Sequence, residues 1–215
     1  MHKFNRPDAP PCLRRYSHPA KKWKDVFGSH KRKIWTRLEQ MQGPRCGYCE
    51  NEIPRKGRLR DGHIEHFEQR SKVPHKTFDW RNLFGSCNRS DSCGTFKDKQ
   101  SYQPQDLIKP DIEDPEQFLV FVSDGTVKAR EGLSINDKHR AEETIRIFNL
   151  NGSLVGEREP AVEPYIETAE TLLELLELDG GIEQYTAALN KELTAIQGLP
   201  FETAIRHTLL QIKQS

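Results

Sequence analysis

The sequence has no run of about 18 apolar residues, the least that a membrane-spanning helix needs, so we expect no membrane-spanning segment. Its first 23 residues, MHKFNRPDAPPCLRRYSHPAKKW, lack the apolar stretch of a secretory signal. No internal repeat or low-complexity tract is present, which argues against a repeat architecture. These absences indicate a cytoplasmic protein in a reducing compartment, where its five cysteines are metal ligands or free thiols rather than disulfides.

The overall composition suits one compact domain, or a small domain with an appendage: 215 residues, of which 34% are hydrophobic and 30% charged. The net charge of +1 conceals an uneven distribution. Residues 1–99 carry 23 Lys and Arg against 11 Asp and Glu, whereas residues 100–215 carry 10 against 21. A basic half favours a polyanion such as nucleic acid, and an acidic half suits a protein partner. The alternative is two solvated faces whose charges offset each other.

Short regular elements are predicted in the first half, around a turn-rich segment at residues 43–62. Residues 1–27 predict an extended basic arm, in which Cys12 has no assigned role. Residues 29–41 have apolar side chains at helical spacing, with Ser29 as the expected N-cap. The rings expected to anchor the arm are Phe4, Tyr16 and Trp23. The remaining expected elements are a strand over 62–67, a second strand within 78–87 and a short helix within 92–99.

The second half predicts a helical bundle with one hairpin. Residues 116–131 predict a β-hairpin that turns at Asp124-Gly125. A helix is expected to begin at Ser134, with an Asp three residues on, and to end near Asn149. Three further helices are predicted over residues 165–178, 182–197 and 201–213. Their apolar stripes are typical of a bundle core, and could alternatively dock a partner.

Four of the five cysteines are spaced as metal ligands. Cys46 and Cys49 form a CxxC knuckle in which Gly47 eases the turn, and Cys87 and Cys93 follow with five residues between them. Four thiolates make a closed tetrahedral zinc site of the structural kind. A segment so poor in apolar residues needs such a site to hold its shape. The alternatives are four unrelated cysteines or a redox CxxC, which the absence of a surrounding βαβ pattern disfavours.

The stretch DGHIEHFEQRSKVP, residues 61–74, lies between the two cysteine pairs. Single histidines are more often packing or surface residues than ligands, but zinc would close this segment into a module that contains Glu65 and His66. Neutral His66 can take a proton from water near pH 7, and Glu65 can hold Mg²⁺ or Mn²⁺. With the nearby basic residues, this pair suits phosphodiester hydrolysis. Neighbouring side chains on a strand point to opposite faces, so both serve one site only if the strand ends or bulges there.

The order CGYCE, HIEHFEQRSKVP, FDWRNLFGSCN and CGTFKDK resembles the HNH (ββα-metal) endonucleases. More closely, it resembles the HNH family found with retrons and Septu-type (PtuB-like) antiphage systems. The segments MHKFNRPDAPPCL, DLIKPDIEDPEQFLVFVSDG and HRAEETIRIFNLN are similar to that family too. The resemblance therefore covers nearly the whole chain, and its motif core is about residues 43–99.

The predicted fold class is α+β: a zinc-stapled ββα-metal (HNH) nuclease core with a basic N-terminal arm and a mainly helical C-terminal half. The predicted boundaries follow from this arrangement. Residues 1–42 form the basic arm and its helix, residues 43–105 the HNH core, and residues 106–215 the hairpin and helical region.

The resemblance also implies roles for individual residues. His66 matches the general base, Glu65 the acidic metal ligand just before it, and Asn82 the middle asparagine, which orients the loop that carries the base. Water activated by His66 would attack the phosphate and leave a 5′-phosphate and a 3′-hydroxyl. The cysteines that match the zinc staple of many HNH proteins are Cys46, Cys49, Cys87 and Cys93.

The chain departs from the HNH pattern after its last cysteine. HNH proteins usually have Asn or His there, where this chain has Gly94. Asp98 is the first substitute as second ligand of the catalytic metal, because it lies one helical turn on from Gly94. Asn88 and His63 are weaker candidates. The alternative for Asp98 is a solvated surface acid.

Family members usually act beside an ABC-type ATPase of the PtuA kind, and in retron systems also beside a reverse transcriptase with its RNA–DNA hybrid. The resemblance implies a defence complex that restrains the nuclease until phage infection. The substrate stays open between DNA and an RNA such as tRNA, because basic charge contacts phosphates rather than bases or sugars.

The predicted function is that of a metal-dependent HNH endonuclease, the effector of a bacterial antiphage complex. One alternative is a non-catalytic, zinc-stapled nucleic-acid-binding adaptor of an ATPase complex. Gly94 favours that alternative, and the pair Glu65 and His66 disfavours it, since binding alone needs no base. A further alternative is a purely structural subunit that recruits an ATPase.

Overall fold

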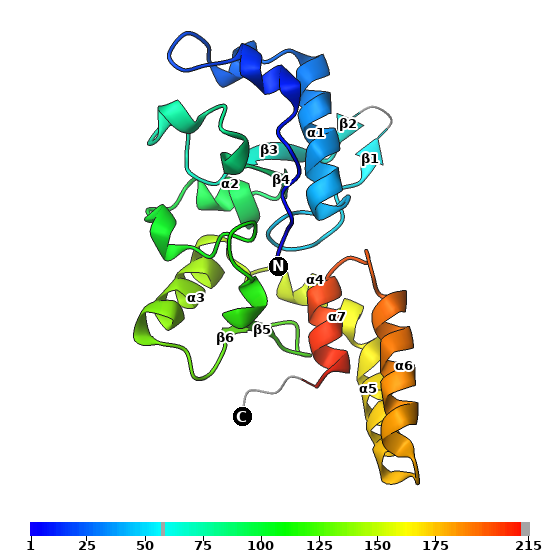
Figure 1. Cartoon of the computed structure of the whole chain (residues 1–215). Helices are drawn as coiled ribbons and strands as arrows, with labels where there is room; N and C mark the ends of the chain where they lie inside the picture. The colour runs from blue at the N-terminus through cyan, green and yellow to red at the C-terminus, as the bar shows by residue number, and fades with distance from the viewer. Residues whose placement is uncertain (57–58, 212–215) are drawn as a thin grey trace.

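The computed structural model describes residues 1–56 and 59–211, and its mixed fold confirms the α+β part of the predicted class. Figure 1 shows the first two strand pairs beside α1, and most of the remaining helices at the opposite end of the molecule. The α-helices of the described residues are α1 (Gly28–Gln42), α2 (Cys93–Lys97), α3 (Ile135–Ile147), α4 (Val155–Val162), α5 (Pro164–Glu174), α6 (Gly181–Ala195) and α7 (Glu202–Leu209). The strands are β1 (Arg55–Lys56), β2 (Leu59–Arg60), β3 (Gly62–His66), β4 (Leu83–Cys87), β5 (Leu119–Phe121) and β6 (Val127–Ala129), paired in sequence order.

Helix α1 extends one residue beyond each end of the predicted range 29–41. Ile34 and Leu38, four residues apart, are fully buried on its inner face. The expected Ser29 cap is wrong, because the N-cap residue is Phe27 and no side chain caps the helix. The Phe27 carbonyl already accepts hydrogen bonds from two N–H groups of the first turn. The helix therefore begins one residue before Ser29.

Strands β3 and β4 form an antiparallel pair that is followed along the chain by α2. The register sets Glu65 opposite Phe84 and His66 opposite Leu83. The strand expected over 62–67 therefore ends one residue early, at His66. Glu65 and His66 were expected to serve one site only if the strand ended or bulged there, and it does end there. Every residue of β4 is buried, because both α1 and α2 pack against this strand.

The contact between α1 and β4 depends on a glycine. The Gln42 side chain donates a hydrogen bond to Gly85 O at 2.8 Å and accepts one from Gly85 N at 2.9 Å. A Cβ at Gly85 would lie 2.8 Å from both the Gln42 amide and the Trp35 ring. A side chain at this position would therefore separate the helix from the strand.

The N-terminal arm lies against β4, and its expected extended conformation is interrupted by two 3₁₀ turns, at Pro11–Arg15 and Trp23–Asp25. Arg6 donates hydrogen bonds to the carbonyl oxygens of Trp80 and Leu83 at 2.8 and 2.9 Å. Its guanidinium carbon lies 4.6 Å from the centre of the Phe84 ring. The expected anchoring rings are buried at Phe4 and Tyr16 and half-buried at Trp23.

The second half contains the expected hairpin, β5 and β6, which turns through Asp124 and Gly125. Ser134 caps α3, since its Oγ accepts a hydrogen bond from the N–H of Asp137 at 3.1 Å. Helix α4 was not predicted, because it has Pro160 in its interior. Helix α7 begins within the predicted range 201–213, whose last two residues lie outside the described residues.

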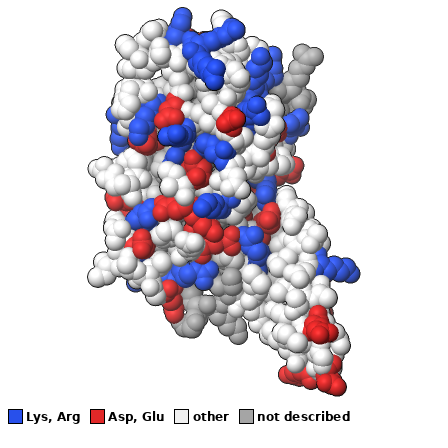
Figure 2. Space-filling model, in the orientation of Figure 1, with Lys and Arg blue, Asp and Glu red and all other residues white. Residues whose placement is uncertain are grey.

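Helices α5 and α6 form a hairpin that projects from the rest of the molecule (Figure 1). Leu172 is buried, whereas Leu173 and Leu176 are 41% and 43% exposed. The leucine stripe of residues 172–176, which runs past the end of α5, is therefore only in part a bundle core. Figure 2 shows Asp and Glu side chains at the free end of this hairpin, and Lys and Arg side chains over the N-terminal segment and α1.

The two halves share one continuous cluster of buried apolar residues. Glu50, which follows the CxxC knuckle, contributes a polar link between them. It accepts hydrogen bonds from Thr203 N at 3.0 Å and from Thr203 Oγ1 at 2.6 Å, at the start of α7. Within the described ranges, no helix combines the length and the apolar character that crossing a bilayer requires.

Candidate functional site

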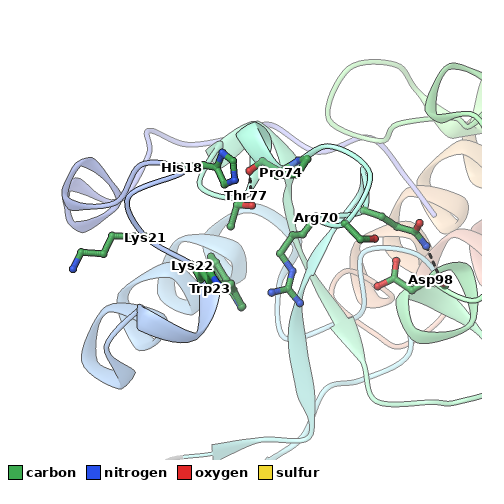
Figure 3. A pocket seen from close by; sticks show the side chains of 10 residues that line it. His18, Lys21, Lys22, Trp23, Arg70, Pro74, Thr77 and Asp98 are labelled. Carbon is green, nitrogen blue, oxygen red and sulfur yellow. Dashed lines mark hydrogen bonds between the residues drawn. The ribbon is translucent and has the colours of Figure 1, made fainter.

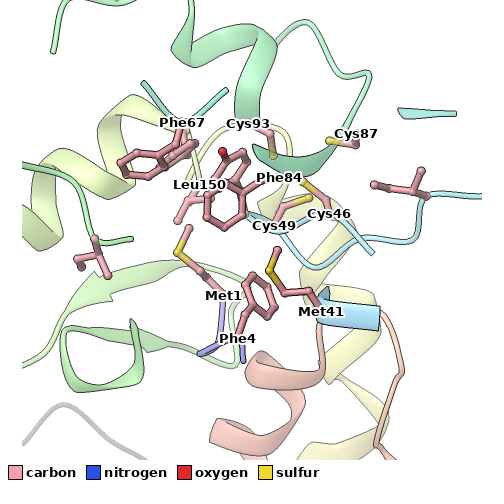
Figure 4. Packing of buried hydrophobic residues seen from close by; sticks show 14 of the residues in the cluster. Met1, Phe4, Met41, Cys46, Cys49, Phe67, Phe84, Cys87, Cys93 and Leu150 are labelled. Atoms are coloured by element: carbon pink, nitrogen blue, oxygen red, sulfur yellow. The ribbon is translucent and has the colours of Figure 1, made fainter. Parts of the chain in front are cut away.

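Four buried cysteines converge where the CxxC knuckle meets the end of β4 and the start of α2 (Figure 4). Their sulfur atoms all lie within 4.8 Å of one another. Four sulfurs at 2.3 Å from a tetrahedral zinc ion would be about 3.8 Å apart. The cluster could therefore hold a structural metal ion such as zinc with small adjustments. Its members are the four predicted residues, Cys46, Cys49, Cys87 and Cys93.

The knuckle turns by a route that the sequence did not indicate. The residue with left-handed backbone geometry is Glu50, at φ 65°, rather than Gly47. The Glu50 N–H donates to Cys46 O at 3.0 Å and closes the turn. The N–H of Gly47 instead donates to Gly85 O at 2.9 Å and fastens the knuckle to β4. One backbone hydrogen bond thus closes the knuckle, and another ties it to β4, so both positions of the CxxC pair are fixed.

The electrostatics of the cluster favour a cation at its centre. The hydrogen bond with Cys46 raises the pKa of Cys49 and the pKa of Cys93 well above the ordinary thiol value. Four thiolates this close and this deeply buried therefore do not coexist without a positive partner. A dication removes this penalty, because metal binding takes the place of the thiol protons.

Glu65 and His63 lie on the same face of β3, two residues apart. His63 Nε2 is 3.3 Å from Glu65 Oε2, and His63 Nδ1 is 3.2 Å from Asn88 Oδ1. Burial lowers the pKa of His63, but the hydrogen bond and charge of Glu65 outweigh it, so the net pKa is raised. Glu65 is 3% exposed, and His63 borders solvent. The pair forms a carboxylate and an imidazole at ligand-like separation.

The Glu65 carboxylate rests against the first turn of α2. A Cβ added to Gly94 would lie 2.7 Å from Glu65 Cδ and 2.7 Å from Glu65 Oε2. Position 94 is where this chain departs from the HNH pattern. Because glycine has no side chain, the Glu65 carboxylate fills the space that a side chain there would take.

Lys97 is a buried cation at the centre of the site. Its ammonium donates hydrogen bonds to His66 O at 3.1 Å, Asp98 Oδ1 at 2.6 Å and Tyr102 Oη at 3.0 Å. These bonds use its three N–H donors. Glu65 Oε1, 2.8 Å from the same nitrogen, is thus paired by charge but has no hydrogen-bond partner among the described residues. Burial lowers the pKa of Lys97, but Glu65, Tyr102 and Asp98 together outweigh it, so the net pKa is raised and Lys97 stays charged.

Sequence reasoning recognised Lys97 only as a nearby basic residue. Nothing in the local sequence indicates that it is buried. Of its partners other than Asp98, Glu65 and His66 belong to β3, and Tyr102 lies beyond the end of α2. Asp98 itself is half exposed and, like Glu65, is paired with the Lys97 ammonium.

His66 is buried and its ring is fixed by two contacts. Nε2 lies 3.0 Å from Thr77 O, and the ring meets Trp23 edge to face with centroids 4.6 Å apart. A carbonyl only accepts, so Nε2 carries the proton of the neutral ring and Nδ1 is left as the basic nitrogen. Burial lowers the pKa of His66 to about 3. The imidazole is therefore neutral at physiological pH.

Asn82 holds the loop between β3 and β4. Its Oδ1 accepts a hydrogen bond from Glu68 N at 2.8 Å, and its Nδ2 donates to Glu68 O at 3.0 Å and to Lys76 O at 3.3 Å. These bonds join the start of the loop to its end, next to Thr77. Asn82 thus positions the carbonyl that orients the His66 ring.

A pocket of about 410 Å³ opens beside His66. Trp23 and Thr77, the two residues that contact the His66 ring, are part of its wall. Figure 3 shows Arg70 between Trp23 and Asp98 at this pocket. Its charged lining residues are Lys21, Lys22, Arg70 and Asp98. The pocket therefore carries a positive excess suited to phosphate groups.

No protein-family model matches the chain. The chain is similar to the Septu protein PtuB of Bacillus thuringiensis, with 27% identity over 142 residues. The aligned part is 65% of this chain and 50% of that protein, so the chain spans about half the length of the relative that it matches. This distant similarity supports a relationship of the chain to the Septu-type family.

Proposed function

We propose that the chain is a metal-dependent HNH endonuclease that acts as an effector in a Septu-type antiphage defence system. The observation that carries this proposal is the orientation of His66. A buried neutral imidazole has its Nε2–H fixed by Thr77 O, on a loop that Asn82 clamps. A general base needs its free nitrogen aimed and unprotonated, and the Thr77 bond leaves Nδ1 of His66 in that state beside the basic pocket.

The donor set beside His66 fits a divalent cation. Glu65 is a buried carboxylate whose Oε1 lies 2.8 Å from Lys97 Nζ and whose Oε2 faces a nitrogen of His63, on the side that borders solvent. Bound Mg²⁺ or Mn²⁺ would polarise the scissile phosphate and stabilise charge on the leaving oxygen. Glu65 would hold the ion, and the four cysteines would hold zinc apart from the chemistry.

The residues of the chain divide the rest of the reaction among them. His66 Nδ1 takes a proton from the attacking water as the water oxygen bonds to phosphorus. The bond from phosphorus to the 3′-oxygen breaks, and its electron pair stays on that oxygen, which takes a proton from solvent water. The products are a 5′-phosphate and a 3′-hydroxyl, and His66 releases its proton to solvent. Lys22 and Arg70 at the pocket neutralise backbone phosphates. DNA and RNA both supply such a backbone.

The partners follow from the same proposal. We propose that the chain works beside an ABC-type ATPase of the PtuA kind, with a retron reverse transcriptase and its RNA–DNA hybrid as a further partner where the system contains one. The projecting α5–α6 hairpin, with exposed Leu173 and Leu176, offers a surface for a protein rather than for nucleic acid.

A non-catalytic, zinc-stapled adaptor is the second candidate. It is favoured by Lys97, which already neutralises the Glu65 charge, and by Gly94, which offers no ligand. Such an adaptor would bind nucleic acid through the same basic pocket without cutting it.

The test uses cells that carry the gene with its genomic neighbours. Wild type, His66→Ala and a control variant, His139→Ala on the exposed face of α3, are infected with phage, and total DNA and RNA are extracted. We expect cleaved nucleic acid in wild type and the control but not in His66→Ala. Intact nucleic acid with phage resistance preserved in all three would favour the adaptor. Equal cleavage in all three would assign the chemistry to another residue or protein.

A further inference from the structure

The proposed nuclease needs a second protein ligand for its divalent cation, and the start of α2 does not supply it. Gly94 has no side chain, and the Glu65 carboxylate fills the space where one would begin. Any ligand at this position would first have to displace Glu65, which is the other ligand. The second ligand must therefore come from another element.

Asp98 is separated from Glu65 by a cation. Its Oδ1 is 2.6 Å from Lys97 Nζ, and Glu65 Oε1 is 2.8 Å from the same nitrogen. The ammonium thus occupies the position between the two carboxylates that a bridging metal ion would need. Because Lys97 is fully buried and bonded on three sides, moving it aside would leave a buried charge without its partners.

His63 contacts the other carboxylate oxygen of Glu65. Its Nε2 lies 3.3 Å from Glu65 Oε2. Adjacent ligand atoms of an octahedral ion with bonds of about 2.1 Å are about 3 Å apart, so this separation is close to what one shared ion requires. His63 is 33% exposed, which leaves a path for a hydrated cation.

The hydrogen bonds around His63 determine which ring nitrogen is free. Asn88 Nδ2 donates to Asp61 Oδ1 at 3.2 Å, a carboxylate oxygen that can only accept. Asn88 Oδ1 is consequently the atom that faces His63 Nδ1, and it takes the Nδ1–H at 3.2 Å. In the neutral ring, Nε2 then carries no proton, and its lone pair is directed at Glu65. A ligating histidine is held in the same way, by a hydrogen bond from its other nitrogen.

A lone pair facing a carboxylate is repulsive unless a positive charge lies between them. A proton or a metal ion can supply that charge at Oε2, because the Lys97 ammonium lies against the other carboxylate oxygen, Oε1, at 2.8 Å. We propose that His63, rather than a residue of α2, is the second protein ligand of the divalent cation that Glu65 holds, in a site built on one face of β3. This inference rests on the proposed function, since it specifies the metal site of the nuclease.

The ligand chemistry predicts which ion binds best. An imidazole beside a carboxylate suits a transition metal, whereas Mg²⁺ prefers an all-oxygen shell. We therefore expect Mn²⁺ to bind more tightly than Mg²⁺. Replacing His63 by Asp would restore an oxygen ligand and shift the preference towards Mg²⁺.

The test measures Mn²⁺ binding to the full chain with its cysteine site saturated with zinc. Calorimetry gives the affinity, and pulsed electron paramagnetic resonance of bound Mn²⁺ detects coupling to an imidazole nitrogen. We expect His63→Ala to weaken Mn²⁺ at least tenfold and to remove the nitrogen coupling. Asp98→Ala and His139→Ala, the latter outside the site, should leave both unchanged. The His63→Asp variant should bind Mn²⁺ without nitrogen coupling, which shows that an altered affinity in His63→Ala is not a folding defect.

Other outcomes separate the two proposals. Unchanged affinity and nitrogen coupling in His63→Ala would overturn the ligand assignment, as would loss of binding in Asp98→Ala alone. The nuclease proposal would survive both results if Glu65→Gln still abolished binding. If the wild-type chain bound neither Mn²⁺ nor Mg²⁺ at millimolar concentration, the ligand assignment and the metal-dependent nuclease would both fail.

Discussion

Glu65 occupies the space that any side chain at position 94 would need, since a Cβ on Gly94 would lie 2.7 Å from Glu65 Oε2. This relationship joins the sequence feature that departs from HNH proteins to the residue that matches their metal ligand. The glycine and the position of the carboxylate depend on each other. A glycine at position 94 is therefore what allows the Glu65 carboxylate to lie against α2.

Replacing Gly94 by Ala tests this dependence. The added methyl group overlaps the Glu65 carboxylate, so the side chain must move or the helix must shift. We expect the free energy of unfolding to fall by about 1–3 kcal/mol and Mn²⁺ affinity to fall about tenfold, measured by chemical denaturation and calorimetry.

Gly156→Ala in α4 is the matched control, because an added Cβ there meets nothing within 4 Å. It should leave stability unchanged or raise it by about 0.5–1 kcal/mol, as a helical Gly→Ala change does. If Gly94→Ala behaved like this control, the carboxylate would not depend on the glycine.

Zinc removal should unfold the region around the CxxC knuckle. Cys87→Ser leaves three thiols, and we expect it to lose bound zinc and to lower the melting temperature by about 10 °C or more, since a structural zinc ion stabilises by several kcal/mol. Elemental analysis and thermal melting provide the readouts. Cys12→Ser is the control, because Cys12 is buried outside the cluster. Full zinc content in Cys87→Ser would contradict the four-cysteine site.

The sequence predicted those elements whose signals are local. Helix α1 follows from the spacing of Ile34 and Leu38, and the hairpin follows from Asp124-Gly125 between two apolar runs. The cysteine cluster was predictable because a CxxC knuckle followed by a second cysteine pair is typical of a structural zinc site. In each case the residues that form the feature also carry its signal.

The parts that were missed depend on contacts between distant segments. The Ser29 cap was wrong because the Phe27 carbonyl, a backbone group present at every residue, begins the helix earlier. Helix α4 was missed because tertiary packing around buried Arg158 overrides the Pro160 signal. The role of Lys97 was missed because its backbone acceptor, His66 O, lies 31 residues away. No periodicity or spacing rule contains that pairing.

Changing Asn82 should impair cleavage without affecting the metal. In Asn82→Asp, the carboxylate still accepts from Glu68 N but repels the two carbonyls that the amide donated to. The loop then no longer fixes the position of Thr77 O, and the His66 ring is no longer held in its orientation. We expect the cleavage rate to fall about 100-fold with Mn²⁺ affinity unchanged. Asn190→Asp, exposed on α6, is the control. Loss of metal in Asn82→Asp would assign Asn82 to the metal site instead.

The lowered pKa of His66 predicts how stability changes with pH. The ring is neutral in the folded protein down to about pH 3, whereas in the unfolded chain it binds a proton below about pH 6.5. Between these values the unfolded state binds more protons, so stability falls as pH falls from about 6.5. The slope from this one residue approaches about 1.4 kcal/mol per pH unit.

The variant His66→Asn removes this titration and keeps a polar side chain. Wild type should lose stability faster than His66→Asn as pH falls from 7 to 5, because only wild type carries this titration. The amount by which the unfolding free energy of wild type exceeds that of His66→Asn should therefore shrink, as measured by denaturation at each pH. Other acid-sensitive groups, including the cysteine cluster, are common to both proteins and cancel in the difference. A difference that stays constant with pH would mean that His66 is solvated and charges at its ordinary pKa.

The basic pocket predicts how nucleic acid affinity responds to salt. Arg70 is exposed at the pocket mouth beside Trp23, so it can neutralise a backbone phosphate without supporting the fold. Each phosphate contact contributes about 0.7–0.9 to the slope of log affinity against log salt concentration, depending on whether the strand is single or double. In Arg70→Ala we expect weaker binding of a labelled oligonucleotide and a slope reduced by about that amount. Lys138→Ala, exposed on α3 away from the pocket, should change neither quantity. An unchanged slope in Arg70→Ala, with weaker binding, would mean that Arg70 contacts a base or orients another side chain rather than a phosphate.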